Sequence, residues 1–230
     1  MRTVHVEPPS EIGRRDGLSY ALFRPDGDPL GGVASVHGAG SCKENHFDFA
    51  RACRAAGLAA VAFDQRGHGE SEGALDGRAI ADVATIAGLL PPGAVAVRGS
   101  SMGGYLALVA GQALGAVAVV AICPASAGML ARGLRERRFS FRADEPSLTR
   151  FLSEHDATAA AAGLGERVLL LHAEGDEQVP VTHSRELHAA APGSRLVVVP
   201  GGHHQSVQHD QELQALSVRF IARAMREGVD

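Results

Sequence analysis

Apolar, valine-rich runs of strand length alternate along the chain with amphipathic stretches of helix length. A short run that is apolar at nearly every position is typical of a strand buried on both faces, and a period near 3.6 residues is typical of a helix with one buried face. The pattern predicts strands over 31–37, 59–64, 94–99, 116–123, 167–173 and 195–200. It predicts helices over 44–56, 77–90, 102–114, 181–190 and 210–226.

Buried strands that alternate with helices indicate an α/β fold, with a mostly parallel sheet covered by helices on both faces. Residues 4–7 and 17–24 alternate more strictly between apolar and polar positions, which favours an antiparallel hairpin at the start of the sheet. Because no repeat or low-complexity linker interrupts the pattern, we expect one domain over residues 1–230.

The segment 125–166 breaks this alternation. It separates two predicted strands, is more polar than its flanks, and carries five arginines between residues 132 and 142. Connections that leave the carboxyl ends of parallel strands border the ligand crevice. We therefore expect a short, lid-like insert over the active site.

Composition narrows the class of protein. The chain has 230 residues, 45% hydrophobic and 21% charged, as expected for a globular domain. A net charge of −4 does not favour nucleic acid, and three cysteines do not form a disulfide scaffold. The start of the chain lacks a secretory apolar core, and residues 105–123 are better explained as a helix followed by a strand than as a membrane span. We expect a cytoplasmic protein without a membrane or nucleic-acid partner, as a monomer or homodimer.

The sequence GSSMG at 99–103 lies between a predicted strand and a predicted helix, which is the context of a nucleophile turn. The residues two before and two after the nucleophile pass too close to other backbone for a side chain. Ser101 has Gly99 and Gly103 at those positions, whereas Ser100 has an arginine and a methionine. Ser101 is therefore the candidate nucleophile, with the backbone N–H of Met102 at the helix N-terminus as an oxyanion donor.

Four further motifs follow the pattern of a known family in the same chain order. The chain resembles the α/β-hydrolases, in particular the small single-domain serine hydrolases. The matching segments are HGAG at 37–40, DQRGHGES at 64–71, GDEQVP at 175–180 and PGGHH at 200–204. The resemblance covers nearly the whole chain and implies the α/β-hydrolase fold with an esterase-like activity.

The resemblance also implies a serine–acid–histidine triad in that order. It places Asp176 at the acid position, with Glu174 and Glu177 as neighbouring alternatives. Either His203 or His204 is the base: a G-x-x-H alignment of the loop favours His204, and a shorter G-H alignment favours His203.

The HGAG loop implies a second oxyanion donor, the backbone N–H of Ala39, with Gly40 as the alternative. We interpret His37 and His68 as residues that brace their loops. The sequence contains neither a complete dinucleotide fingerprint nor a Walker loop nor an H-E-x-x-H motif, so we expect no cofactor and no metal. Cys123 ends a predicted strand and is interpreted as a buried thiol that could instead face the site.

A triad predicts hydrolysis of a small or medium carboxylic ester or thioester through an acyl-enzyme. Within the insert, Arg135, Phe139 and Arg142 are the candidate substrate contacts. The arginines could equally form a solvated, salt-bridged helix face. Two other functions stay open: an aminopeptidase-like or C–C bond hydrolase on the same triad, and a non-catalytic binding protein with this fold.

Overall fold

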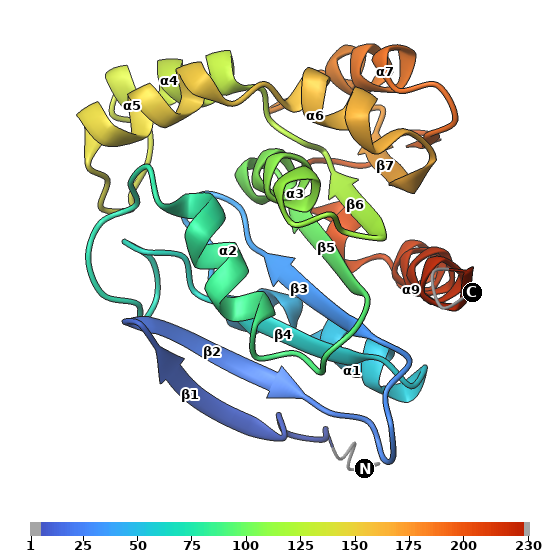
Figure 1. Cartoon of the computed structure of the whole chain (residues 1–230). Coiled ribbons are helices and arrows are strands. Elements are labelled where there is room, and N and C mark those ends of the chain that lie inside the picture. Colours follow the sequence, from blue (N-terminus) through green and yellow to red (C-terminus); the bar gives the residue numbers. More distant parts are fainter. Residues whose placement is uncertain (1–5, 228–230) are drawn as a thin grey trace, which may run out of the picture.

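An eight-stranded sheet forms the centre of the molecule. The computed structural model describes residues 6–227. The strands lie in the order β1-β2-β4-β3-β5-β6-β7-β8, with the pairs β1–β2 and β2–β4 antiparallel and every other pair parallel (Figure 1). Their bounds are β1 Glu11–Arg15, β2 Leu18–Phe23, β3 Gly32–Val36, β4 Ala59–Phe63, β5 Val95–Ser100, β6 Ala118–Ile122, β7 Val168–Ala173 and β8 Arg195–Val199.

All six predicted parallel strands are present, each within two residues of its expected ends. The predicted first strand of the hairpin is wrong: residues 4 and 5 lie outside the described residues, and Val6 and Glu7 form no strand. The hairpin joins β1 to β2 instead, with Arg15 opposite Leu18. Asp16 and Gly17 lie between them with φ of 50° and 81°, as a two-residue hairpin turn requires.

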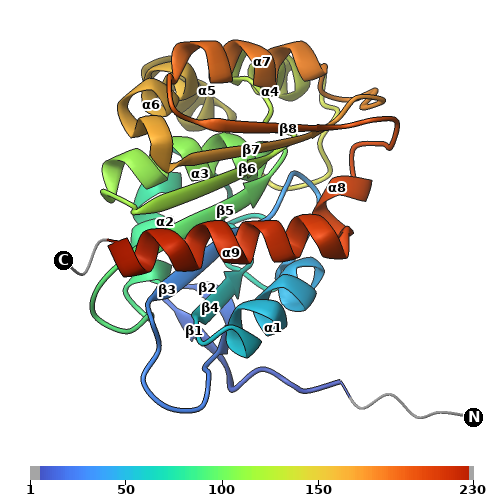
Figure 2. The ribbon, with the colours of Figure 1, turned by 90° about the vertical axis from the view of Figure 1, so that its right-hand side faces the viewer.

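Helices cover both faces of the sheet (Figures 1 and 2). One face packs against α1 (Phe47–Ala55) and α9 (Gln211–Glu227), and the other against α2 (Ala79–Ala87), α3 (Met102–Ala113) and α7 (Val181–Ala190). The short helices are η1 Lys43–His46, η2 Gly165–Arg167 and α8 Ser206–His209. Within residues 6–227, no helix is both long enough and apolar enough to cross a membrane.

Each parallel strand contributes to two cores, because successive side chains of a strand point to opposite faces. In β6, Val119 and Ala121 pack into the core beneath α3, whereas Val120 and Ile122 pack into the core beneath α9. Burial on both faces explains why these strands are apolar at nearly every position. The carboxyl ends of β5, β7 and β8 all lie at one edge, where the loops carrying the candidate site begin.

The segment 125–166 forms three helices, α4 (Ala127–Arg135), α5 (Glu145–Glu154) and α6 (Ala157–Leu164). Their N-caps Ser126, Asp144 and Asp156 each accept a backbone N–H of the first turn, which explains where the helices begin. Helix α6 packs against α3 and α7 and therefore belongs to the layer that covers the sheet. Helices α4 and α5 and the loop between them lie outside that layer and pack on α3, with the ring of Phe151 against Tyr105, so the expected insert is shorter than 125–166.

Candidate active site

The turn after β5 holds Ser101 in a backbone conformation that few residues adopt, with φ 56° and ψ −120°. The Ser101 N–H donates to the carbonyl of Ile122 at 2.8 Å, which anchors the turn to β6. A Cβ on Gly99 would lie 2.0 Å from the carbonyl oxygen of Gly103, and one on Gly103 would lie 2.1 Å from that of Val36. Both positions therefore have to be glycine, as the sequence pattern indicates for a turn around Ser101.

A hydrogen-bonded acid–histidine pair lies at the ends of β7 and β8. Asp176 is buried, and its Oδ2 lies 2.7 Å from Nδ1 of His204. Its Oδ1 accepts the backbone N–H groups of Gln178 and Val179, each at 2.9 Å. Burial alone would raise the pKa of Asp176, but the hydrogen bonds from Val179 and His204 outweigh it and lower that pKa. The carboxylate is therefore ionised at neutral pH.

The two adjacent histidines lie differently. The His204 side chain is 12% exposed and reaches Asp176. His203 is exposed, and its backbone N–H and carbonyl both bond to the hydroxyl of Ser206. Asp176 is thus paired with the histidine that the longer alignment of the loop favours. The neighbouring acids Glu174 and Glu177 are exposed and do not contact His204.

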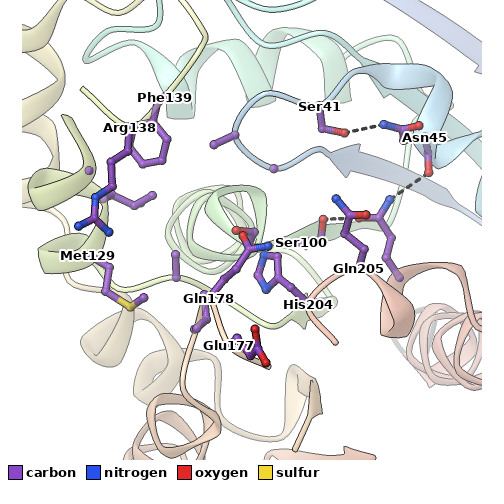
Figure 3. Close-up of a pocket in the computed structure, with 18 of the residues that line it drawn as sticks. Ser41, Asn45, Ser100, Met129, Arg138, Phe139, Glu177, Gln178, His204 and Gln205 are labelled. Carbon is purple, nitrogen blue, oxygen red and sulfur yellow. Dashed lines mark hydrogen bonds between the residues drawn. The ribbon is translucent and has the colours of Figure 1, made fainter. Parts of the chain in front are cut away.

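Ser101 and His204 line one cavity of about 630 Å³ (Figure 3). The structure shows no hydrogen bond between the side chains of Ser101 and His204, and the imidazole of His204 is bonded to Asp176. Ala39 lines the same cavity, and Met102 is buried at the first position of α3. The other lining residues come mainly from the loop after β3, the insert and the loops carrying Asp176 and His204, and include Ser41, Asn45, Met129, Leu130, Phe139, Gln178 and Gln205.

Donors for an oxyanion are present on two backbone segments. The N–H of Met102 has no acceptor within α3, because the first N–H groups of a helix lie before the first intrahelical bond. The loop at Ala39 is supported by His37, whose Nδ1 donates to the carbonyl of Gly38 at 2.8 Å and whose Nε2 accepts the N–H of Gln65 at 3.0 Å. Burial lowers the pKa of His37 to about 4, so it is neutral. His37 braces the loop, as interpreted from the sequence.

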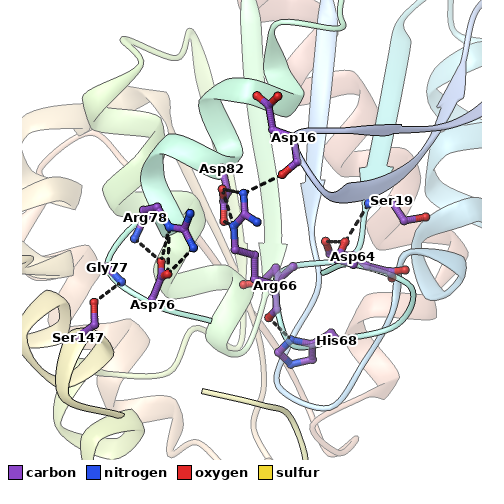
Figure 4. A network of polar contacts seen from close by, with 12 residues as sticks. Asp16, Ser19, Asp64, Arg66, His68, Asp76, Gly77, Arg78, Asp82 and Ser147 are labelled. Carbon is purple, nitrogen blue, oxygen red and sulfur yellow. Dashed lines mark hydrogen bonds and ion pairs between the residues drawn. The ribbon is translucent and has the colours of Figure 1, made fainter. Parts of the chain in front are cut away.

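The DQRGHGES segment forms a buried polar network behind this loop (Figure 4). Asp64 accepts the backbone N–H and the ammonium of Lys43, at 2.8 and 2.9 Å. Burial disfavours the charge of Lys43, but hydrogen bonds from its ammonium to Glu70 and Asp64 outweigh burial and raise its pKa. Arg66 pairs with Asp82 through several bonds of 2.9–3.1 Å. Because Lys43 follows the HGAG loop in the chain, the network holds that loop in place.

The insert contributes different residues to the cavity from those that the sequence indicated. Phe139 lines it, but Arg135 and Arg142 do not, whereas Arg132 and Arg138 do. Arg135 is the last residue of α4, and its exposed side chain lies outside the lining. The backbone of Arg142 is paired with Gly67 and Leu75, and its side chain is exposed.

A buried histidine behind the Asp176–His204 pair was not among the site residues predicted from the sequence. His172 lies in β7, and its Nε2 is 2.9 Å from the carbonyl oxygen of Val179 and 3.5 Å from Oδ2 of Asp176. Its Nδ1 bonds to the hydroxyl of Ser184 at 2.7 Å. Because Nε2–H donates to Val179, His172 supports the loop that holds the Asp176 carboxylate. A polar residue inside an otherwise apolar strand was the signal in the sequence.

Cys123 lies beside the same pair. Its thiol sulfur, a carboxylate oxygen of Asp176 and a ring nitrogen of His204 lie within 4.8 Å of one another, and this is the only such group of metal-ligating types in residues 6–227. Burial raises the pKa of the Cys123 thiol to about 12, which disfavours the thiolate that a metal binds. The group therefore fits a metal poorly. The interpretation of Cys123 as a buried thiol agrees with its 1% exposure.

Comparison with known proteins identifies the family. A family model described as alpha/beta hydrolase family matches residues 35–161, and one described as TAP-like protein matches residues 152–227. A search of curated proteins found no match.

Solved structures share the fold at low identity. The monoacylglycerol lipase of Paleococcus ferrophilus is 21% identical, with a TM-score of 0.69 over 92% of this chain and 99% of that one. Est1E from Butyrivibrio proteoclasticus, solved with ferulic acid, is 19% identical, with a TM-score of 0.69 over 96% and 99%. The mouse alpha/beta hydrolase domain-containing protein 10 is 21% identical, with a TM-score of 0.67 over 94% and 98%. With the family model matching more than half of its residues, the chain belongs to the alpha/beta hydrolase family.

Proposed function

We propose that the protein is a serine hydrolase that cleaves a small or medium carboxylic ester or thioester through an acyl-enzyme. The observation that carries the proposal is the shared cavity: Ser101, on a strained turn, faces the same space as His204, whose Nδ1 is bonded to the buried carboxylate of Asp176. Structural neighbours that include a monoacylglycerol lipase, and Est1E solved with ferulic acid, support the same class of reaction.

The hydrogen bond to Asp176 determines which ring nitrogen of His204 carries the proton. Because the carboxylate is ionised, Nδ1 of His204 carries the proton, and the lone pair of Nε2 is free to accept one. The hydroxyl of Ser101 attacks the carbonyl carbon of the ester while its proton passes to Nε2. The new C–O bond places negative charge on the former carbonyl oxygen. The backbone N–H groups of Ala39 and Met102 are the donors assigned to that oxyanion.

The tetrahedral intermediate then breaks its bond to the leaving group. The alcohol or thiol departs with the proton from His204, and the acyl group stays on Ser101. A water molecule attacks this acyl-enzyme with His204 again accepting the proton, and the collapse releases the carboxylic acid and restores Ser101. Every step uses groups of this chain and water.

A second candidate is an aminopeptidase-like reaction on the same residues. Glu177 lines the cavity beside the Asp176 loop, and its carboxylate could hold the amine of a substrate. Faster hydrolysis of an amino-acid anilide than of the matched N-acetyl anilide, lost in Glu177→Gln, would favour this candidate over the esterase.

The test of the esterase is covalent labelling combined with turnover. We expect a fluorophosphonate probe to label the protein at Ser101, and Ser101→Ala to lower kcat/KM for 4-nitrophenyl acetate by about 10³-fold or more. Ser100→Ala is the matched control: its hydroxyl is buried and donates to Gln208, so its loss should cost far less activity. Circular dichroism checks that both variants fold. Activity retained in folded Ser101→Ala would contradict the proposal.

A further inference from the structure

Two arginines of the insert form one wall of the cavity. Arg132 and Arg138 line the same space as Ser101 and His204, and both arginine side chains are exposed to it and to solvent. Figure 3 shows Arg138 beside Met129, on the opposite side of the cavity from His204. The one acid among the lining residues, Glu177, belongs to the loop on the His204 side. Positive charge is therefore concentrated on the insert wall.

A defined turn at the end of α4 positions Arg138 at the cavity. The N–H of Arg138 donates to the carbonyl of Gly133 at 2.9 Å, and that of Arg137 donates to Leu134 at 3.0 Å, the pair of bonds of a Schellman motif. Arg137 occupies the left-handed position of the motif with φ 50°, where glycine is the usual residue. The reversal brings Arg138 and the following aromatic residue back against the cavity.

The ring of Phe139 packs directly on α4, at a position where the helix has no side chain. A Cβ on Gly133 would lie 2.5 Å from Cζ of Phe139, so the ring can pack on α4 only because that position is glycine. The packed ring holds the backbone next to Arg138 in place. The arginine wall is thus built on a helix end and a packed aromatic ring.

The guanidinium groups of Arg132 and Arg138 differ in their ion pairs. Arg138 forms an exposed ion pair with Glu136 at 2.6 Å. Arg132 has no ion-pair partner in the part of the chain that the structure describes, residues 6–227. A guanidinium presents several N–H donors in a plane that matches a carboxylate. Arg132 is therefore free to bind an anion that enters the cavity.

We infer that the Arg132–Arg138 wall is an anion subsite, so that the substrate is an ester carrying a carboxylate away from the scissile bond. This inference rests on the proposed esterase function and names its substrate class. Because the chain as a whole carries a net charge of −4, the preference arises from contact with these two arginines rather than from the overall field. The carboxylate can belong to the acyl part or to the alcohol part, and the substrate pairs below separate the two.

The test compares esters that differ only in charge. On the alcohol side the pair is 4-acetoxybenzoate and 4-acetoxybenzamide, and on the acyl side it is monomethyl glutarate and methyl glutaramate. We expect the wild type to favour the anionic member of at least one pair, and Arg132→Gln combined with Arg138→Gln to reduce that kcat/KM ratio by about tenfold, the scale of a charge-assisted hydrogen bond. Arg135→Gln removes the same charge from the same helix outside the lining, and should keep the ratio.

The second part of the experiment measures the binding of anions that the protein does not hydrolyse. Calorimetric titration with 4-hydroxybenzoate or glutarate should show binding that weakens in the double variant and with added salt. Equal ratios and equal binding in the wild type and the double variant would overturn the subsite, while hydrolysis of the neutral esters would leave the esterase proposal intact. Absence of both hydrolysis and fluorophosphonate labelling, with arginine-dependent binding retained, would overturn the esterase and keep the anion subsite.

Discussion

Backbone strain in this protein is concentrated around the cavity. Four non-glycine residues among those described have positive φ, and three of them, Ser101, Cys123 and Arg137, border the site or shape its wall. Such a conformation costs an L-residue about 1–2 kcal/mol. Ser101 and Cys123 follow the ends of adjacent strands, β5 and β6. The strain at Ser101 and Cys123 is maintained because the N–H of each donates to a neighbouring strand, that of Ser101 to Ile122 and that of Cys123 to Leu171.

At the scale of single residues we predict unequal effects for the two adjacent histidines. His204→Ala should lower kcat/KM for 4-nitrophenyl acetate by about 10³-fold or more, because it removes the group bonded to Asp176. His203→Ala should cost less than about tenfold, since its exposed side chain has no bond to Asp176 or to Ser101. Steady-state kinetics of both variants on one ester is the measurement. The reverse order of effects would assign the base to His203.

Contacts between aromatic and imidazole rings, and close backbone contacts, connect the elements around the site. His37, the first residue of the HGAG segment, contacts His68 edge to face with ring centroids 4.8 Å apart. His68 stacks on Phe141 at 4.4 Å, and Phe141 stacks on Phe139 at 5.2 Å. This series joins the loop after β3 to the insert wall. On the other side of the turn, α3 approaches β3 so closely that only glycine fits at position 103.

The prediction at the scale of elements concerns that approach. In Gly103→Ala the new methyl group would lie 2.1 Å from the Val36 carbonyl oxygen and 2.5 Å from that of His37, both backbone atoms that cannot rotate away. We expect a loss of about 3 kcal/mol or more in the free energy of unfolding, measured with urea, as for severe overpacking.

The control for this substitution is Gly128→Ala in α4. A Cβ there meets nothing closer than 4.0 Å, so alanine should leave stability unchanged or raise it by up to about 1 kcal/mol through helix propensity. Equal stability of the two variants would contradict the close packing of α3 against β3.

At the scale of the whole molecule, several histidines are buried as neutral groups. Burial lowers the pKa of His37 to about 4, and it also lowers the pKa values of His46, His68 and His172. In the unfolded chain these imidazoles take up protons near pH 6.5. The unfolded state then binds more protons than the native state, so stability is highest above pH 6.5 and falls as the pH decreases.

We therefore predict a steep acid dependence of stability. Below about pH 6.5, each of these histidines adds to the slope as long as its imidazole is protonated only in the unfolded chain. For His37, whose pKa is about 4, the contribution is up to about 1.4 kcal/mol per pH unit. Urea unfolding at pH 7.5, 6.5, 5.5 and 4.5 measures the slope. His68→Phe, which keeps a ring in the stack with Phe141, should reduce the slope, whereas the exposed His203→Gln should not. A flat profile over this range would show that the buried histidines are protonated in the native state.

The sequence by itself determined the features that depend on near neighbours along the chain. The apolar runs predicted six parallel strands, because burial on both faces leaves few polar positions. The spacing of Gly99 and Gly103 selected Ser101 over Ser100, because a strand–turn–helix of this kind requires small residues at both positions wherever it occurs. Gly99 is required by a contact within the turn, and Gly103 by the approach of α3 to β3. The order of the motifs predicted the fold that the family comparison confirms.

Only the tertiary structure decided which side chains from distant segments meet. The rotation of α4 about its axis placed Arg132, and not Arg135, along the cavity. The reversal at Arg137 brought Arg138 to the same wall, whereas Arg142 lies outside it. His172 reached the Asp176 loop through the register of β7, which no local pattern specifies. Such contacts join residues far apart in the chain or depend on how an element is rotated. The physical reason is that packing energy depends on distance in space, whereas sequence patterns record distance along the chain.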